Sequence, residues 1–426
     1  MRKRAGALVG YAERIVRTDL RYVLSGGFFL SLTQVSSAII GLILTTAFAN
    51  LLPVETYGTY RYILAMYTMF AIAAMPGLDT AVIQSVSRGY DRAYLDGVRT
   101  RMRWALLGTA AAIAYGGYLV AQQSTVMGYL FIMLGIALPL MESGSMYTTY
   151  LNAKREYRTW AIMDIIGQVC SAAVLILTMY LTKNIFVLMI GYFLPYITIR
   201  WGATWWVVRH HNMEGEHDPD FFAYGRSLTL FQVATRAISS LDQIVLYHFL
   251  GPAQVAMFSL ATAIPTRLQG LFRITGTLAF PKFATQHRQD ILRGLPVRMA
   301  LFGAGIVLLC LLYILVAPYL FKILFPKYLP SLFFSQVAIF YTLSAVTYPF
   351  GAFLNAHKRL RENYMLSIAA FIVKATCLLV FVPRLGIWGA VIGLLATSAT
   401  TIVIASWYLY SMRNDASVSV PGDAVE

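Results

Sequence analysis

Apolar stretches of about 20 residues or more recur along the whole chain and alternate with short polar segments. Each stretch is long enough to cross the hydrocarbon core of a bilayer as a helix. In lipid the backbone must satisfy its own hydrogen bonds, which leaves only helices or closed barrels, and barrel strands are only about 10 residues long. The pattern predicts an all-α polytopic membrane protein of about twelve helices, at 24–52, 57–87, 101–122, 126–152, 158–182, 185–208, 222–250, 253–281, 297–320, 331–356, 361–383 and 386–411.

The composition agrees with a membrane protein. Of the 426 residues, 58% are hydrophobic and 12% are charged, whereas soluble domains carry about 25% charged residues. The three cysteines, Cys170, Cys310 and Cys377, all fall within apolar stretches. They predict neither a disulfide framework nor a cysteine metal site. The basic start of the chain leads into 24–52, which is longer than the core of a signal peptide, so we expect a first membrane helix there.

The positive charges of the connections predict the orientation. With the N-terminus placed in the cytoplasm, the inner segments hold 23 Lys and Arg residues and the outer connections hold four. Cytoplasmic loops carry this excess in membrane proteins generally. We therefore expect an even number of helices, with both termini cytoplasmic, in a bacterial or archaeal cytoplasmic membrane. Much of the net charge of +15 is then topological, and we expect no nucleic-acid partner.

A polar segment after the sixth stretch divides the chain into two halves. A shift of 198 residues lays 33–40 over 231–238 and preserves the direction of the helices. Duplicated halves with the substrate between them are a common transporter plan. The expected organisation is a basic amphipathic cytoplasmic arm, a first six-helix bundle, a cytoplasmic linker, a second six-helix bundle and a cytoplasmic tail, at 1–23, 24–208, 209–221, 222–411 and 412–426.

Four motifs in order along the chain resemble one family. The outer turn at 51–60 reads Leu-Leu-Pro-Val-Glu-Thr-Tyr-Gly-Thr-Tyr, and 77–81 reads Gly-Leu-Asp-Thr-Ala. Later, 242–251 contains Asp-Gln-Ile-Val-Leu and Leu-Gly, and 385–390 reads Leu-Gly-Ile-Trp-Gly-Ala. These resemble the polysaccharide transporters, the Wzx-type oligosaccharide flippases of the multidrug/oligosaccharidyl-lipid/polysaccharide exporter superfamily. The second-half turn at 253–257 departs from the family in lacking a Tyr-Gly-like pair.

The resemblance implies a flippase that moves a polyprenyl-pyrophosphate-linked oligosaccharide by alternating access, and that is not an enzyme. It implies the lipid bilayer, this lipid-linked oligosaccharide and other polysaccharide-assembly proteins as partners. No cofactor is expected, and coupling to H⁺ or Na⁺ is left open. The chain has no Gly-Lys dipeptide, so a P-loop ATPase is excluded.

Polar residues inside the membrane helices are the candidate site residues, because ionisable groups there usually face the bundle interior or water. Within 222–250 the polar residues recur in steps of three and four on one face, and 24–52 carries a weaker stripe. Stripes that face one another would line a central cavity, with packing between helices as the alternative. The candidate substrate-binding residues are Arg236, Arg267, Arg273, Lys374, Gln232 and Gln34.

Arginines in such a cavity would suit a pyrophosphate or an acidic sugar. Alternatively, they pair with acids inside the protein. The acidic candidates for charge pairing or ion coupling are Asp242, Asp79, Glu142 and Asp164. Arg200 lies near the cytoplasmic end of its helix and could extend toward the interface.

Two further features each allow a structural and a functional interpretation. Met75-Pro76-Gly77 and Pro265 could bend or hinge their helices. His210, His211 and His217 have acids nearby, but their spacing fits no structural zinc site, so a solvated linker is expected and no metal.

Two other functions compete with the flippase. A cation-coupled drug or metabolite exporter of the same superfamily would need an acidic cavity, and the basic helices argue against it. A membrane-embedded polymerase or glycosyltransferase would need a large extramembrane loop, and the longest predicted connections have only about 15 residues.

Overall fold

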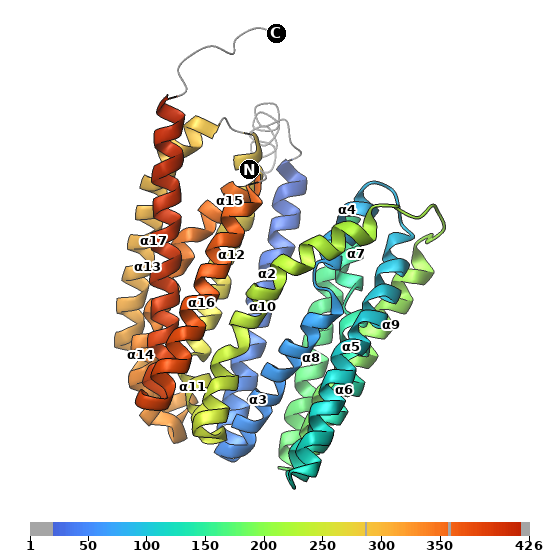
Figure 1. The fold of residues 1–426 in the computed structure, drawn as a ribbon, viewed down its shortest axis with the longest axis vertical. Helices are drawn as coiled ribbons and strands as arrows, with labels where there is room; N and C mark the ends of the chain where they lie inside the picture. The colour runs from blue at the N-terminus through green and yellow to red at the C-terminus, as the bar shows by residue number, and fades with distance from the viewer. Residues whose placement is uncertain (1–19, 286–287, 357–358, 419–426) are drawn as a thin grey trace, which may run out of the picture. The chain divides into compact units, whose positions relative to one another are not determined.

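The computed structural model describes residues 20–285, 288–356 and 359–418. Over these ranges the chain forms helices and no strands (Figure 1). Residues 1–19 of the predicted arm at 1–23 lie outside the described residues. The predicted tail at 412–426 lies outside them from residue 419 onward.

In the first part of the chain the helices are α2 (Leu20–Leu51), α3 (Val54–Phe70), η1 (Ala71–Ala74), α4 (Leu78–Ser87), α5 (Ala93–Ala121), α6 (Thr125–Gly144), α7 (Tyr147–Ala153), α8 (Tyr157–Leu181), α9 (Ile185–His210), α10 (Phe221–Leu250) and α11 (Pro252–Ala261). They continue with α12 (Ala263–Thr285), α13 (Arg288–Leu324), η2 (Pro326–Ser331), α14 (Leu332–Ala338), η3 (Ile339–Thr347), α15 (Tyr348–Ala356), α16 (Leu360–Leu385) and α17 (Ile387–Val418).

The all-α polytopic architecture is confirmed, but a total of twelve spanning helices is not. Within the described ranges, nine helices are long and apolar enough to cross a membrane, or ten if α3 and α4 count as one bent span. The helices α10 and α12 are not among the nine. The polar stripe predicted on α10 explains the difference, since its Arg, Gln and Ser side chains lower the hydropathy of the helix.

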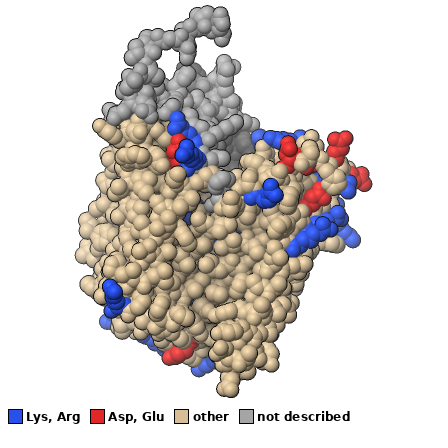
Figure 2. Space-filling view, viewed as in Figure 1, with Lys and Arg blue, Asp and Glu red and all other residues tan. Residues whose placement is uncertain are grey.

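Charged side chains lie mainly at helix ends, as expected of a membrane protein. On the face shown in Figure 2, Lys, Arg, Asp and Glu gather near the ends of α4, α7 and α9, and the sides of the helices are almost free of charge. Large apolar side chains are exposed there instead, for example Leu107 at 58% and Leu177 at 58%. Lipid is the solvent that such a surface requires.

Contacts group the helices into two units. The first unit comprises 28–260 and 324–328, and the second comprises 261–323 and 329–426 together with the chain up to residue 27. The helices α10 and α11 follow the polar segment 209–221 in sequence but pack within the first unit, where α10 contacts α3 and α4. The predicted division into two six-helix halves stays a prediction.

Glycines allow the helices of the first unit to approach closely. A Cβ atom at Gly77 would lie 2.4 Å from the carbonyl oxygen of Gly225, where α10 passes the start of α4. A Cβ atom at Gly58 would lie 1.8 Å from the carbonyl oxygen of Pro252, at the start of α11. These contacts have no room for a side chain, as is typical of helix pairs in membranes. They hold α10 and α11 against α3 and α4.

The predicted bend at Met75-Pro76-Gly77 is present as a break in the helix. Met75 has a φ of 56°, and the helices on either side of the break meet at 50°. The break leaves the backbone N–H of Gly77 without a partner in its own helix, and this N–H donates to Thr229 Oγ1 of α10 at 3.1 Å. Pro265 lies in the first turn of α12, where proline costs no hydrogen bond. A hinge role for either position stays a prediction.

The second unit has its own apolar core. The helices α12 and α15 pack together, and α16 packs along α17. Phe350, Phe353 and Leu354 of α15 are fully buried in one core cluster. Cys310 of α13 lies in another cluster and contacts Thr342 Oγ1 at 3.5 Å.

We expect Gly58→Ala to lower the thermal unfolding temperature of the purified protein by several degrees. The added methyl group meets backbone rather than a flexible side chain, and overpacking costs about 1–3 kcal/mol. Gly117→Ala is the matched control, because no atom lies within 4 Å of a Cβ there. Equal unfolding temperatures for the two variants would contradict the close contact between α3 and α11.

Candidate functional site

Five charged side chains from five helices meet inside the first unit. They are Asp79 of α4, Arg101 of α5, Glu142 of α6, Arg200 of α9 and Arg236 of α10. We call this group the charge cluster. It contains three of the predicted site residues, together with Arg200 and Arg101.

Arg101 forms the most buried ion pair of the charge cluster. Its guanidinium lies 2.8 Å from Asp79 Oδ1, and its side chain is 1% exposed. Asp79 also accepts a hydrogen bond from Thr149 Oγ1 at 3.1 Å. This pair links α4, α5 and α7. Asp79 was predicted to be a charge-pairing candidate, and the structure identifies Arg101 as its partner.

Glu142 has one aromatic partner and one basic partner. Tyr67 donates its hydroxyl to Glu142 Oε1 at 2.7 Å, and Arg236 Nη1 lies 3.6 Å from Glu142 Oε2. The second distance exceeds the about 2.7–2.9 Å of a strong charge-assisted hydrogen bond. The side chain of Arg236 remains 29% exposed, against 12% for Glu142. Arg236 is therefore paired but loosely held.

Arg200 joins the charge cluster instead of extending toward the interface. Its Nη1 donates to the backbone carbonyl of Met141 at 3.0 Å, and its guanidinium lies over the ring of Tyr196 at 5.3 Å. Arg200 and Arg101 both interact electrostatically with Glu142. The prediction that Arg200 reaches outward is corrected by these contacts, because the carbonyl of Met141 in the last turn of α6 accepts its hydrogen bond.

The five residues of the charge cluster are three arginines and two carboxylates, and Asp164 of α8 interacts electrostatically with Arg200 from outside it. Arg101 is committed to Asp79, whereas Arg236 shares Glu142 with Tyr67 and Arg200. An anion that approached the exposed part of Arg236 would meet a guanidinium whose hydrogen-bonding capacity is largely unused.

The polar stripe of α10 contacts helices of the first half. Thr229 accepts the N–H of Gly77, Arg236 reaches Glu142, and Gln243 pairs with Arg61 of α3. With its amide oriented to satisfy both atoms, Gln243 accepts from Arg61 Nη2 at 2.7 Å and donates to the Arg61 carbonyl at 3.0 Å. These stripe residues therefore do pack between helices. The cavity that the stripes were predicted to line stays a prediction.

The remaining candidates are not members of the charge cluster, although Asp164 interacts electrostatically with Arg200. In the first unit, Gln34 is exposed, Gln232 is half-buried and Asp242 is buried at 6% exposure. Asp164 accepts from Gln168 Nε2 at 2.6 Å, and Gln168 in turn accepts from Ser37 of α2 at 2.7 Å. This chain of hydrogen bonds ties α2 to α8.

Three basic candidates belong to the second unit. Arg267 and Arg273 are exposed on α12, and Lys374 is buried in α16. Arg273 forms a hydrogen bond with the hydroxyl of Tyr348. The substrate-binding role of all three stays a prediction.

Sequence reasoning overlooked Arg101 and Tyr67. In sequence Arg101 is the first residue of the predicted span 101–122 and lies close to Arg99 and Arg103. Its distance from the start of α5 gives a signal, since residue 101 is two turns into the helix and Arg99 and Arg103 point to the other side. No sequence pattern marks Tyr67 as the partner of Glu142.

Two of the linker histidines contact carboxylates at the starts of neighbouring helices. His211 Nε2 lies 2.8 Å from Glu156 Oε1, and His217 Nδ1 lies 2.7 Å from Asp96 Oδ2. Asp218 accepts from Ser85 Oγ at 2.6 Å. These contacts tie the linker to α4, α5 and the start of α8, and most of its residues between 212 and 220 are exposed, as expected of a solvated segment.

The comparisons with known proteins agree with this fold. A family described as "Polysaccharide biosynthesis protein" matches residues 23–287, and none of the curated proteins matches the chain. A structure of the lipid II flippase MurJ in an inward closed conformation is similar with a TM-score of 0.65 and 15% identity, over 91% of this chain and 87% of that chain.

A multidrug resistance transporter of the MATE family and the MOP superfamily has the same fold. Its inward-facing structure matches with a TM-score of 0.57 and 12% identity, over 93% of this chain and 96% of that chain. At these identities the likeness shows the fold alone. The chain is thus a multi-pass membrane protein with the fold of MOP transporters.

We predict that the Arg101–Asp79 pair is strongly coupled. Asp79→Asn alone leaves a buried guanidinium without its carboxylate, which costs about 1–3 kcal/mol, and the same change in an Arg101→Met background costs less. Thermal unfolding of the four purified proteins measures this difference. The pair Lys154–Asp91, at 2.7 Å and partly exposed, is the control, with a coupling of about 0–1 kcal/mol. Additive effects at 79 and 101 would refute the coupling.

Proposed function

The chain belongs to the polysaccharide biosynthesis protein family, and we propose that it is a flippase for a polyprenyl-pyrophosphate-linked oligosaccharide. The proposed reaction moves the oligosaccharide from the cytoplasmic to the periplasmic leaflet of the cytoplasmic membrane. No covalent bond changes, so the protein acts as a transporter and not as an enzyme. The N- and C-termini are cytoplasmic in this proposal, as the loop charges predict.

The loosely paired Arg236 is the observation that carries the proposal. Its side chain is 29% exposed, and its guanidinium lies 3.6 Å from Glu142 within the charge cluster. A guanidinium that is only loosely paired inside a membrane protein keeps donors that an anion can use. A pyrophosphate offers the oxygens that a guanidinium binds in pairs.

The passenger would move by alternating access without ATP. The sugar and pyrophosphate would pass through the protein while the polyprenyl tail stays in lipid. The break at Met75 and the break between α11 and α12 offer two places where helices can change direction. Arg267, Arg273 and Lys374 would supply further positive charge along the route.

Coupling to protons is part of this proposal, with Glu142 as the acidic candidate that contacts Arg236. Na⁺ is the alternative ion, and Asp242 is the second acidic candidate.

A cation-coupled drug exporter is the competing function. The shared fold allows it, but a cationic drug requires acidic groups that face it. In the charge cluster each carboxylate already has a basic partner. We therefore favour the anionic passenger, with other polysaccharide-assembly proteins as the partners that make and receive it.

A strain that lacks the gene, complemented with variants, tests the proposal. We expect the deletion to lose surface polysaccharide and to accumulate lipid-linked oligosaccharide on the cytoplasmic face. Arg236→Ala should restore export at least about tenfold less well than the unchanged gene, because a charge-assisted contact is lost. Arg236→Lys should fall between the two, since it keeps the charge without the paired donors.

Arg384→Ala serves as the control, because Arg384 is exposed at the end of α16 and should restore export fully. Membrane levels of every variant are compared by immunoblotting. Normal surface polysaccharide in the deletion strain would refute the function. Full complementation by Arg236→Ala would refute the role of this arginine.

A further inference from the structure

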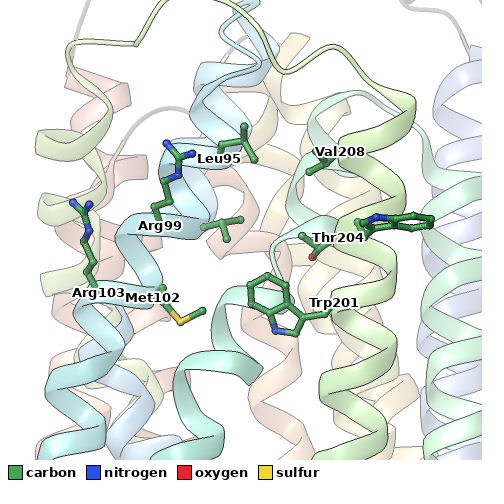
Figure 3. A pocket seen from close by; sticks show the side chains of 9 residues that line it. Leu95, Arg99, Met102, Arg103, Trp201, Thr204 and Val208 are labelled. Atoms are coloured by element: carbon green, nitrogen blue, oxygen red, sulfur yellow. The ribbon is translucent and has the colours of Figure 1, made fainter.

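A pocket of about 510 Å³ opens on the side of the first unit, apart from the charge cluster. It lies between the first turns of α5 and the last turns of α9 (Figure 3). Its volume is within the range of sites that hold small organic ligands, about 300–1,000 Å³. The lining residues are Leu95, Val98, Arg99, Met102, Arg103, Trp201, Thr204, Trp205 and Val208.

The floor of this pocket is apolar and held in place. Met102 and Trp201 approach one another across it in Figure 3. The indole N–H of Trp201 donates to the carbonyl of Leu140 at 3.0 Å, and Thr204 Oγ1 donates to the carbonyl of Gly144 at 3.3 Å. Because α6 satisfies both polar groups, α9 presents only carbon surface to the pocket. A hydrocarbon chain is the ligand that such a floor accommodates.

Two arginines on α5 give the pocket a cationic border. Arg99 and Arg103 are four residues apart and share one side of the helix, and both are exposed. Figure 3 shows both guanidinium groups directed toward the end of α5 at which Leu95 lies. Among the residues that the structure describes, no carboxylate forms an ion pair with either. Arg101, between them in sequence, faces the interior and Asp79.

On the α9 side, a further cation lies next to a residue that lines the pocket. The guanidinium of Arg209 lies 4.3 Å from the centre of the Trp205 ring, a cation–π contact. Trp205 itself is 57% exposed. An exposed tryptophan covered by an arginine is typical of the level at which lipid headgroups meet the hydrocarbon region.

We propose that this pocket binds an anionic phospholipid of the surrounding membrane. The phosphate lies between Arg99 and Arg103, and one acyl chain lies along Met102 and Trp201. The position fits, because Arg99 and Arg103 are about 9 and 15 Å along α5 from its first residue, at the end that the loop charges predict to be cytoplasmic. Basic pockets between membrane helices on that side favour anionic headgroups.

Other occupants fit less well. A second protein helix would cover the apolar floor but leave two arginines without a counter-charge. A soluble phosphate would satisfy the arginines and leave the floor empty. A zwitterionic phospholipid would fill the floor, but its choline would place a positive charge beside the cationic border. An anionic phospholipid satisfies both parts of the site, independently of which passenger the protein carries.

Native mass spectrometry of the full chain in detergent, titrated with dioleoyl-phosphatidylglycerol, tests the proposal. We expect the double variant Arg99→Gln/Arg103→Gln to bind at least about tenfold more weakly than the unchanged protein. The control Arg88→Gln/Arg158→Gln removes two exposed arginines elsewhere and should bind normally. Met102→Gln should weaken binding through the floor while keeping both arginines.

Two competitors identify the occupant. Dioleoyl-phosphatidylcholine should bind more weakly than phosphatidylglycerol, and glycerol phosphate should not displace the lipid. Equal binding of both phospholipids, displacement by glycerol phosphate, or normal binding by the 99/103 double variant would each overturn the proposal. Gel filtration and the unfolding temperature show whether each variant is folded, and Arg99→Lys/Arg103→Lys, which keeps both charges, should retain most of the binding.

Discussion

The pairing of buried arginines with carboxylates is the constraint on which the first unit depends. A charge inside a membrane protein is tolerated only where it finds a partner or water. Arg101 meets this requirement through Asp79, and Arg200 through the carbonyl of Met141 and its interaction with Glu142. Each contact joins different helices, so α4, α5, α6 and α9 must hold fixed positions. Arg236 is the member whose partner is distant, which makes it the natural place for a ligand.

Close helix packing makes these pairings possible. Gly77 lets α10 approach the broken helix of α3 and α4, and Thr229 then satisfies the backbone that the break exposes. Gly144 has the same role between α6 and α9, where a Cβ would lie 3.2 Å from the Trp201 ring. The contact at Gly144 has two consequences, because it places Arg200 in the charge cluster and Trp201 in the pocket between α5 and α9. The interior site and the lipid-facing site therefore share one helix interface.

Much of this could be predicted from the sequence, and the exceptions have physical reasons. Hydropathy predicted the helices, because every segment that crosses lipid must be apolar and must satisfy its own backbone hydrogen bonds. The helix α10 is present, but it is not among the helices that are apolar enough to span a membrane, because its polar stripe lowers its hydropathy. The same stripe made it a candidate for function. The charge-pairing role of Asp79 and Glu142 followed from the cost of burial, but their partners did not, because Arg101 and Tyr67 come from helices whose packing no local pattern specifies. Arg200 was misjudged for the same reason, because the carbonyl of Met141 that it contacts lies far away in sequence.

The central claim is that the protein moves a lipid-linked oligosaccharide across a bilayer, and reconstitution tests it most directly. The purified chain is incorporated into liposomes that carry a fluorescent polyprenyl-pyrophosphate-linked oligosaccharide, and a membrane-impermeant quencher measures how much of the label reaches each leaflet. The account predicts that the protein makes the inner-leaflet label accessible without ATP, and that the Arg236→Ala variant does so much more slowly. Label that stays protected in liposomes containing folded protein, with or without an imposed H⁺ or Na⁺ gradient, would contradict it.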